Sequence, residues 1–233
     1  MKVIGLLGGM SWESSAEYYR IVNERVKLLL GGYHSARVVL YSVDFAEVER
    51  MQAEDRWDDA ARLLRAGADA LRRAGADIIV LCTNTMHKVA DSLGPILHLG
   101  DATAAAVEAA GVRTVGLLGT AFTMEQDFYR GRLESHGLTV LTPSAEDRAE
   151  VHRVIYDELV LGRVLERSRQ VYREVIARLV ERGAQGVVLG CTEIELLVSQ
   201  EDSPVPVFPT TRLHAELAVD LALRGSGPPG PAR

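Results

Sequence analysis

The chain has 233 residues, of which 47% are hydrophobic and 25% are charged, and its formal net charge is -6. These values are ordinary for a globular protein with one large domain or two small ones. The acidic balance, without a basic cluster, argues against nucleic acid as a partner. No stretch approaches the roughly 20 apolar residues of a membrane span, and the apolar run after Met1 is too short for a signal peptide. We therefore expect a cytoplasmic protein without a membrane partner.

Short apolar runs alternate along the chain with longer segments of helical periodicity. The runs predict strands at Val3–Leu7, Ala36–Ser42, Ile78–Cys82, Ile96–Leu99, Thr114–Leu118, Thr139–Leu141, Gly186–Gly190 and Val205–Phe208. Helices are predicted at Trp12–Leu30, Trp57–Ala74, Thr103–Ala110, Glu125–His136, Ala145–Leu161, Glu166–Arg182 and Arg212–Leu223. This alternation is typical of an α/β fold, in which helices cover both faces of a mostly parallel sheet.

A weak internal repeat indicates two similar α/β domains. The segment Val3–Gly9 resembles Thr114–Thr120, and a cysteine-containing strand end follows each of them after roughly 70–75 residues. We expect the first domain to comprise residues 1–99 and 208–224, and the second to comprise residues 100–207. The Gly- and Pro-rich residues 225–233 are expected to form a disordered tail.

Cys82 and Cys191 are the only cysteines, and each follows a strongly apolar run. Ligands of open parallel sheets bind beyond the carboxyl ends of the strands, so the segments 8–11, 83–85, 120–123 and 192–193 are expected around one crevice. Two cysteine-bearing strand ends suggest a reaction that approaches one carbon from opposite faces. Neither cysteine has a second Cys or His at ligand spacing, so no metal is expected. Gly8-Gly9 does not match a dinucleotide-binding fingerprint.

Four segments are similar to the aspartate/glutamate racemase family: Gly5–Ser14, Cys82–His87, Thr123–Gly131 and Gly190–Ile194. The similarity is greatest to the bacterial branch of broad-specificity or L-aspartate/glutamate-specific amino-acid racemases. It implies two pseudo-symmetric, flavodoxin-like domains with the active site in the cleft between them. It also implies a homodimer, no pyridoxal phosphate, no metal, and two acid/base residues that face each other across the substrate. Hydantoin racemases, maleate isomerases and arylmalonate decarboxylases resemble one another in these segments, so the reaction stays open.

The first half of the chain departs from the family pattern Cys-Asn-Thr. Here Asn84-Thr85 is preceded by Thr83, and the cysteine lies one position earlier. If Asn-Thr sets the register, Thr83 occupies the place of the catalytic cysteine, and Cys82 points into the core because successive strand residues face opposite sides. We therefore predict Thr83 and Cys191 as the catalytic pair. The alternative for Thr83 is a hydroxyl that caps the following helix.

Racemisation removes the α-proton of an amino acid and returns one from the other side. The substrate carboxylate then needs hydrogen-bond donors, because it takes on enediolate charge. A thiol suits proton abstraction, since its reference pKa of about 8.5 can be lowered at a helix N-terminus, whereas a threonine hydroxyl is a poor base. We therefore expect the two enantiomers to exchange their α-protons at unequal rates. The expected substrate contacts are Gly9, Met10, Gln52, Asn84, Thr85, Thr123, Thr192 and Glu193.

The sequence thus predicts a cofactor-independent racemase that acts on aspartate, glutamate or a broader set of amino acids. The resemblance implies that Gln52 contacts the substrate side chain. Glu158–Gly162 offers no Lys or Arg for a distal carboxylate, and Arg50 has no assigned place, which favours a broader or less acidic set of substrates. His87 is interpreted as a supporting or surface histidine rather than a base. The alternatives are a single-thiol decarboxylase or isomerase of a small dicarboxylate, and a non-catalytic binding protein.

Overall fold

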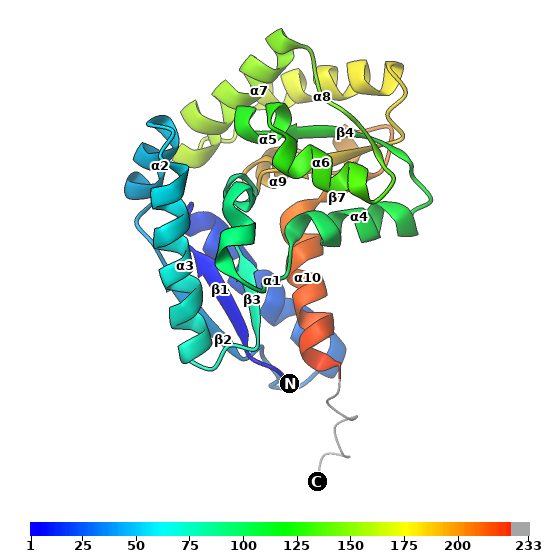
Figure 1. Cartoon of the computed structure of the whole chain (residues 1–233). Coiled ribbons are helices and arrows are strands. Elements are labelled where there is room, and N and C mark those ends of the chain that lie inside the picture. Colours follow the sequence, from blue (N-terminus) through cyan, green and yellow to red (C-terminus); the bar gives the residue numbers. More distant parts are fainter. Residues whose placement is uncertain (225–233) are drawn as a thin grey trace. The chain divides into compact units, whose positions relative to one another are not determined.

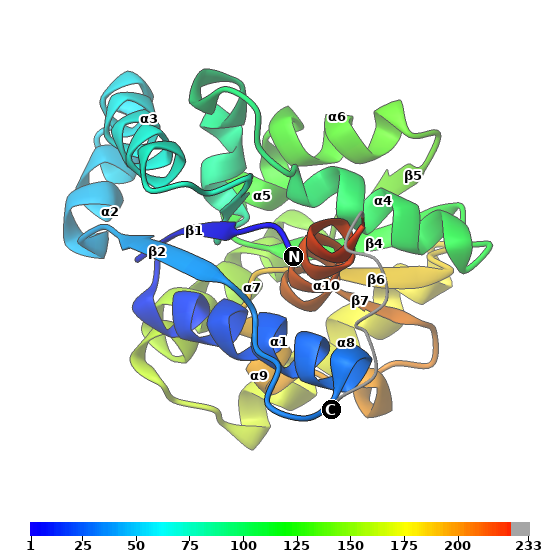
Figure 2. The same cartoon turned by 90° about the horizontal axis from the view of Figure 1, so that it is seen from below.

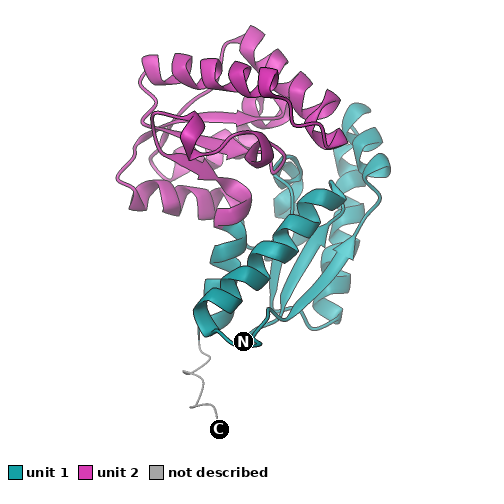
Figure 3. Cartoon of the chain, turned by 180° about the vertical axis from the view of Figure 1, so that it is seen from behind, with its two compact units in different colours: residues 1–98, 214–233 teal, residues 99–213 magenta. Residues whose placement is uncertain are grey.

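The computed structural model describes residues 1–224, and the predicted tail at 225–233 lies outside the described residues. The chain divides into two compact units (Figure 3). Unit 1 contains residues 1–98 and the chain from His214 onward, and unit 2 contains Leu99–Leu213. Each unit has one parallel sheet with helices on both faces (Figure 1), which confirms the predicted α/β fold class.

Unit 1 has three parallel strands in the order β2-β1-β3. These strands are β1 (Ile4–Gly8), β2 (Val38–Ser42) and β3 (Ile78–Leu81). Helix α1 (Trp12–Leu30) packs on one face, together with the part of α10 (Thr210–Leu223) that belongs to this unit. Helices α2 (Phe45–Ala53) and α3 (Trp57–Arg73) lie on the opposite face from α1 (Figure 2). A 3-10 helix, η1 (Thr85–Leu93), follows β3 and packs against α3.

Alternation along β1 explains how the two faces of this sheet are filled. Ile4 and Leu6 pack with Tyr18 of α1, whereas Leu7 packs with Leu64 and Ala68 of α3. All of these side chains are inaccessible to solvent. A strand buried on both faces is apolar throughout, which is the reason that β1 reads as a continuous apolar run in the sequence.

Unit 2 has four parallel strands in the order β5-β4-β6-β7. They are β4 (Thr114–Gly119), β5 (Thr139–Leu141), β6 (Gly186–Gly190) and β7 (Val207–Pro209). Helices α4 (Leu99–Ala109) and α6 (Asp127–Ser135) cover one face, and α7 (Ala145–Asp157) and α8 (Glu166–Glu181) cover the other. The shorter elements are α5 (Ala121–Glu125), η2 (Leu159–Leu161), α9 (Ile194–Leu197) and η3 (Gln200–Asp202).

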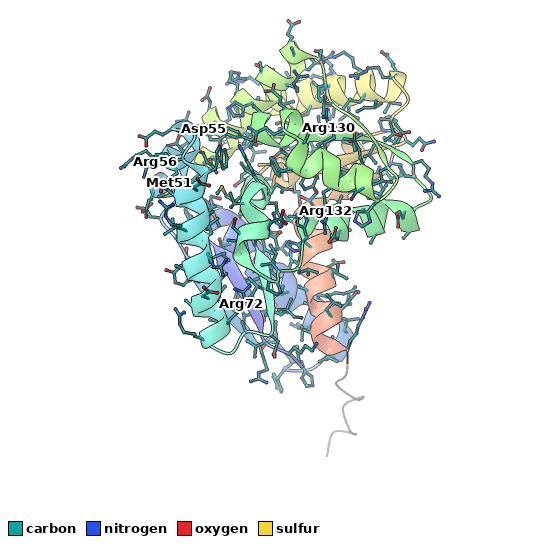
Figure 4. All side chains as sticks on the ribbon, in the orientation of Figure 1. Met51, Asp55, Arg56, Arg72, Arg130 and Arg132 are labelled. Carbon is teal, nitrogen blue, oxygen red and sulfur yellow. The ribbon has the colours of Figure 1, made fainter. Side chains whose placement is uncertain are left out.

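Two arginines, both labelled in Figure 4, tie elements together within their own units. In unit 1, Arg72 of α3 donates to the carbonyls of Leu93 (2.7 Å) and Pro95 (2.9 Å), which holds the end of η1. In unit 2, Arg132 of α6 donates through two nitrogens to Asp101 of α4, at 2.6 and 2.7 Å. The planar guanidinium suits both arrangements because its donors point in fixed directions.

The predicted strand at Ile96–Leu99 was wrong. Only a single parallel bridge, between Val80 and Leu97, forms there. Pro95 precedes it and lacks an N–H, and α4 already begins at Leu99. The chain also rejoins unit 1 at His214, later than the expected residue 208, because β7 pairs with β6 and the Thr210 hydroxyl donates to the Leu189 carbonyl at 2.8 Å.

Helix α2 was not predicted, although Asp44 provides an N-cap signal. The Asp44 carboxylate accepts a hydrogen bond from the Ala46 N–H at 3.1 Å, which satisfies one of the free donors at the helix start. Among residues 1–224, no helix has both the length and the apolar character to cross a membrane.

Candidate functional site

The predicted site residues fall into two groups, one at the carboxyl ends of the strands of each unit. In unit 1, the chain turns sharply at Gly9, where φ is +96°. A Cβ atom at Gly9 would lie 2.2 Å from the Val43 carbonyl oxygen, so only glycine fits. The Gly9 N–H donates to the Ser15 hydroxyl at 2.7 Å. The donor that we expected for a substrate carboxylate at this position is therefore already hydrogen-bonded inside the unit, by a residue that the sequence did not single out.

Cys82 is a core residue, as the register argument predicts. Its side chain is inaccessible to solvent and packs between α1 and α10, and its sulfur lies 3.6 Å from the Val80 carbonyl oxygen. Burial raises the pKa of the Cys82 thiol well above its usual range. Thr83 follows at the end of β3 and is 8% exposed. Of these two neighbouring residues, only Thr83 is thus accessible to solvent at the end of the strand.

The backbone of Thr83 is fixed from both sides. Its N–H donates to the Leu81 carbonyl at 2.9 Å, and its carbonyl accepts from His87 Nδ1 at 2.7 Å. Since a carbonyl only accepts, Nδ1 of His87 carries the proton. His87 is buried, so of our two interpretations, a supporting histidine or a surface histidine, the structure agrees with the first. The N-cap of η1 is Asn84, and its side chain makes no cap hydrogen bond.

Gln52 joins this group through a contact between two elements distant in sequence. Its Nε2 donates to Met86 Sδ of η1 at 2.9 Å, which places the end of α2 beside the loop that carries Thr83, Asn84 and Thr85. Met10 and Met51 belong to the same apolar cluster as Met86, and Met51 is labelled in Figure 4. Gln52 Oε1 is buried and has no hydrogen-bond partner in the described chain.

In unit 2, Cys191 follows β6 and forms a pair with Glu193. The thiol donates to Glu193 Oε2 at 2.9 Å, and Cys191 is 8% exposed. Burial raises the pKa of the Cys191 thiol, and the charge and hydrogen bond of Glu193 raise it further. The backbone N–H groups of Glu193 and Ile194 act in the opposite direction but are outweighed. The expectation of a lowered thiol pKa is therefore wrong for the resting protein, in which Cys191 is a protonated thiol.

Thr123 and Thr192 are each held by a further threonine, Thr120 of the predicted segment 120–123 and Thr211, which the sequence did not single out. Thr123 Oγ1 lies 3.2 Å from Thr120 Oγ1, and Thr192 Oγ1 lies 2.9 Å from Thr211 Oγ1. Glycine at position 190 leaves room for Thr123, because a Cβ there would lie 3.2 Å from its Cγ2. Extending the strand-end rule to the run at 205–208 would have identified Thr211.

The segment at residues 158–162 offers no cation for the distal carboxylate of a substrate. It contains a buried carboxylate instead, that of Glu158. Glu158 is buried and accepts hydrogen bonds from the Ser168 hydroxyl and, at 3.0 Å, from Arg153. The Ser168 bond and the Arg153 guanidinium hold the pKa of Glu158 below its usual range against the effect of burial. Arg50, the other cation considered, is an exposed residue of α2.

Histidine side chains in unit 1 form a buried cluster that does not have the form of a metal site. His214 lies 2.9 Å from both the Tyr18 hydroxyl and the Leu97 carbonyl, and the His87 ring is 4.7 Å from that of His98. Burial lowers the pKa of His214 to about 4, so it is neutral. Within residues 1–224, no group of three or more His, Cys, Asp or Glu side chains could hold a metal ion.

Comparison with known proteins identifies the family. The model of the Asp/Glu/hydantoin racemase family matches residues 7–218. A crystal structure from Yersinia pestis, described as a candidate Asp/Glu racemase, is 55% identical, covers 96% of this chain and 100% of its own, and has a TM-score of 0.90. An aspartate racemase homologue from Pyrococcus horikoshii is 35% identical, with coverages of 95% and 99% and a TM-score of 0.83.

A more distant structure, the aspartate racemase of Picrophilus torridus, is 21% identical, with coverages of 95% and 94% and a TM-score of 0.76, and it supports the fold alone. The chain belongs to the Asp/Glu/hydantoin racemase family, which makes it an isomerase of the racemase type.

Proposed function

We propose that this chain is a cofactor-independent amino-acid racemase in which Cys191 and Thr83 exchange the α-proton on opposite faces of the substrate. The observation that carries this proposal is the thiol–carboxylate pair of Cys191 and Glu193, 2.9 Å apart at the end of β6. A buried thiol with a carboxylate acceptor at hydrogen-bond distance has the parts that proton transfer at carbon requires. Membership of a racemase family supports the same reaction type.

On the Cys191 side, the resting thiol must first lose its proton. Glu193 accepts that proton, and the resulting thiolate removes the α-proton, whose bonding electrons move into an enediolate on the substrate carboxylate. Neutralising Glu193 in this step removes the charge that raises the thiol pKa in the resting state. The candidate contacts donate hydrogen bonds to the enediolate: Met10, Asn84, Thr85, Thr123 and Thr192. Gly9 has no side chain, so the backbone there can approach the substrate closely.

On the Thr83 side, a hydroxyl delivers a proton to the opposite face of the carbanion and is reprotonated from water. This direction is favourable because a carbanion is a far stronger base than an alkoxide. The reverse direction requires Thr83 to act as a base, for which a hydroxyl is poorly suited. The hydrogen bond from His87 to the Thr83 carbonyl keeps the backbone in place while its side chain acts.

A single-thiol decarboxylase or isomerase acting on a small dicarboxylate is the second candidate. It is favoured by the position of the second cysteine, since Cys82 is enclosed in the core and leaves Cys191 as the one thiol at a strand end. Such an enzyme protonates a carbanion from one face only. It therefore needs no partner for Cys191 on the other face, and Thr83 would serve as a substrate contact.

The proposal is tested by proton NMR in D2O with a panel of L- and D-amino acids. We expect loss of the α-proton signal with the native protein, loss of that activity in Cys191→Ala, and a drop of at least a hundredfold in Glu193→Gln. Cys82→Ala makes the same change at the core cysteine and should keep the exchange. Thr83→Ala should retain exchange of one enantiomer while losing inversion.

Absence of exchange on every amino acid, with turnover of substituted malonates or of maleate, would select the second candidate. Ligand-induced thermal stabilisation without any turnover would instead indicate a binding protein. A homodimeric state and a cytoplasmic location stay predictions from the sequence, and analytical ultracentrifugation would check the first.

A further inference from the structure

Strand β2 forms an exposed edge of the unit 1 sheet. It pairs with β1 on one side, and no other strand among residues 1–224 pairs with its outer side. Arg37 and Val43, which flank the strand, direct backbone hydrogen bonds toward β1. Backbone groups alternate in direction along a strand, so the N–H and C=O groups of Val38, Leu40 and Ser42 point away from β1. Such a row of donors and acceptors can pair with another chain.

This edge strand lacks the features that normally prevent such pairing. Natural edge strands are protected by charged side chains, by proline, by a bulge or by a covering helix. The sequence of β2 is Val-Val-Leu-Tyr-Ser, without charge or proline, and its register with β1 is continuous, without a bulge. Leu40 is 47% exposed on the α1 face of the sheet, and Tyr41 is 37% exposed on the α3 face. The exposed edge is therefore apolar on both faces.

Helix α1 extends this surface beside β2 (Figure 2). Asn23 of α1 fixes the contact, because its Oδ1 accepts a hydrogen bond from the Ala36 N–H at 3.0 Å, just before the chain enters β2. Tyr19 lies one helical turn before Asn23 and Trp12 about three turns before it, so both are on the same side of the helix. Tyr19 is 53% exposed and Trp12 is 68% exposed. Exposed aromatic residues are typical of protein interfaces.

The exposed apolar side chains of the described chain concentrate in this region. Most of the large ones lie in α1, in β2 or in the loop between them: Trp12, Tyr19, Leu28, Leu29, Tyr33, Leu40 and Tyr41. The others are in unit 2: Leu161, Val164 and Leu196. Single apolar residues scattered over a surface are normal, whereas a concentration beside an unprotected strand edge indicates a surface that another protein covers.

The charges at the two ends of β2 indicate which protein covers it. Arg37 precedes the strand and Asp44 follows it, and both are exposed. Within the chain, Arg37 reaches the Met1 carbonyl at 3.5 Å, and the Asp44 carboxylate accepts from the Ala46 N–H at 3.1 Å. Two β2 strands related by two-fold symmetry run antiparallel, which brings Arg37 of each copy beside Asp44 of the other. The edge is therefore complementary to itself.

We propose that the chain forms a two-fold symmetric dimer through β2, in which the unit 1 sheets of two copies join into one continuous sheet. Leu40, in the middle of the strand, lies at the two-fold axis and exchanges backbone hydrogen bonds with Leu40 of the second copy. Val38 of each copy pairs with Ser42 of the other, so all outward backbone groups of the strand have partners. Trp12 and Tyr19 flank the junction on the α1 face. Formation of this dimer is independent of the reaction and of the proposed function.

Analytical ultracentrifugation over a range of concentrations tests this dimer. The native protein should sediment as a dimer. Leu40→Lys and Leu40→Glu should each raise its dissociation constant by roughly a hundredfold or more, because each places like charges opposite each other at the two-fold axis. An equimolar mixture of the two variants should recover the dimer, since opposite charges then meet. Leu161→Lys makes the same change at an exposed leucine of unit 2 and should leave the dimer unchanged.

Oxidative cross-linking provides a second measurement, which also decides the matter if the charged variants do not fold. Leu40→Cys should form a disulfide between copies, because opposing Cα atoms in an antiparallel pair lie about 5.5 Å apart, and Leu161→Cys should not. Cys82 and Cys191 are buried and do not compete. A native protein that is monomeric at every concentration, a dimer that persists in both charged variants, a mixture that stays monomeric, or the absence of a disulfide in Leu40→Cys would overturn the proposal.

Discussion

Lowering the pH from 7.5 to 5 should destabilise unit 1 through His214. This side chain is inaccessible to solvent between α10, α1 and the Leu97 carbonyl. Its Nε2 faces a carbonyl and must donate, so the Tyr18 hydroxyl donates to Nδ1 of the neutral ring. Burial, reinforced by the nearby His98 and opposed by the Leu97 hydrogen bond, holds the pKa of His214 at about 4.

The magnitude follows from proton linkage. The unfolded chain has an ordinary histidine with a pKa of about 6.5, so below that pH it binds a proton that the folded protein rejects. Stability from this group is complete above pH 6.5, decreases as the pH falls, and stops decreasing below the folded pKa. With a folded value of about 4, the loss between pH 7.5 and pH 5 is about 2 kcal/mol.

Urea unfolding at a series of pH values measures this loss. His214→Gln removes the titrating group, so the native protein should lose about 2 kcal/mol more than the variant between pH 7.5 and pH 5. Proton NMR of the His214 ring gives a direct reading and should reveal no titration above pH 5. Parallel pH profiles in the two proteins, or a ring that titrates near pH 6.5, would refute the reasoning.

Two further predictions concern stability. Gly9→Ala should destabilise the protein by about 3 kcal/mol, because its Cβ would overlap the Val43 backbone at a positive φ. Gly31→Ala, also at positive φ but with open space around it, should cost only about 1 kcal/mol in the same urea titration. Asp202→Ala should cost about 2–3 kcal/mol, since it removes hydrogen bonds from Ser199 and Arg173. The exposed neighbour Glu201→Ala should stay within about 0.5 kcal/mol, and equal losses at the two positions would contradict the assignment.

The sequence predicted the sheets well because a strand buried on both faces must be apolar throughout, as β1, β3 and β6 are. It failed at Ile96–Leu99, because this apolar run forms only a single bridge, between Val80 and Leu97, before α4 begins at Leu99. Helix α2 was missed although its apolar residues Phe45, Val48 and Met51 recur at helical spacing after Asp44. Here the signal was present, but it covers only nine residues.

The candidate site, like the fold, has features that the sequence predicts and features that it does not. Positions at strand ends could be predicted, because the chain reverses direction where an apolar run stops. Partners could not: Gln52 meets Met86 across 34 positions, and Thr192 meets Thr211 across 19. The state of Cys191 was also beyond the sequence, since it depends on whether the Glu193 carboxylate turns toward the thiol or away from it.

In the proposed mechanism, Cys191 with its carboxylate acceptor and the Thr83 hydroxyl are unequal acid/base groups, yet a racemase cannot favour one enantiomer overall. The two enantiomers have equal free energy, so their kcat/KM values for inversion must be equal. The inequality between Cys191 and Thr83 must therefore appear elsewhere. The enantiomer whose α-proton faces Cys191 can lose and regain it many times with retention before Thr83 delivers a proton from the other side. Its mirror image exchanges only when it inverts. The ratio of exchange to inversion, measured separately for each enantiomer in D2O, thus reports how far Thr83 limits the reaction, and equal ratios for the two enantiomers would require two groups of equal competence.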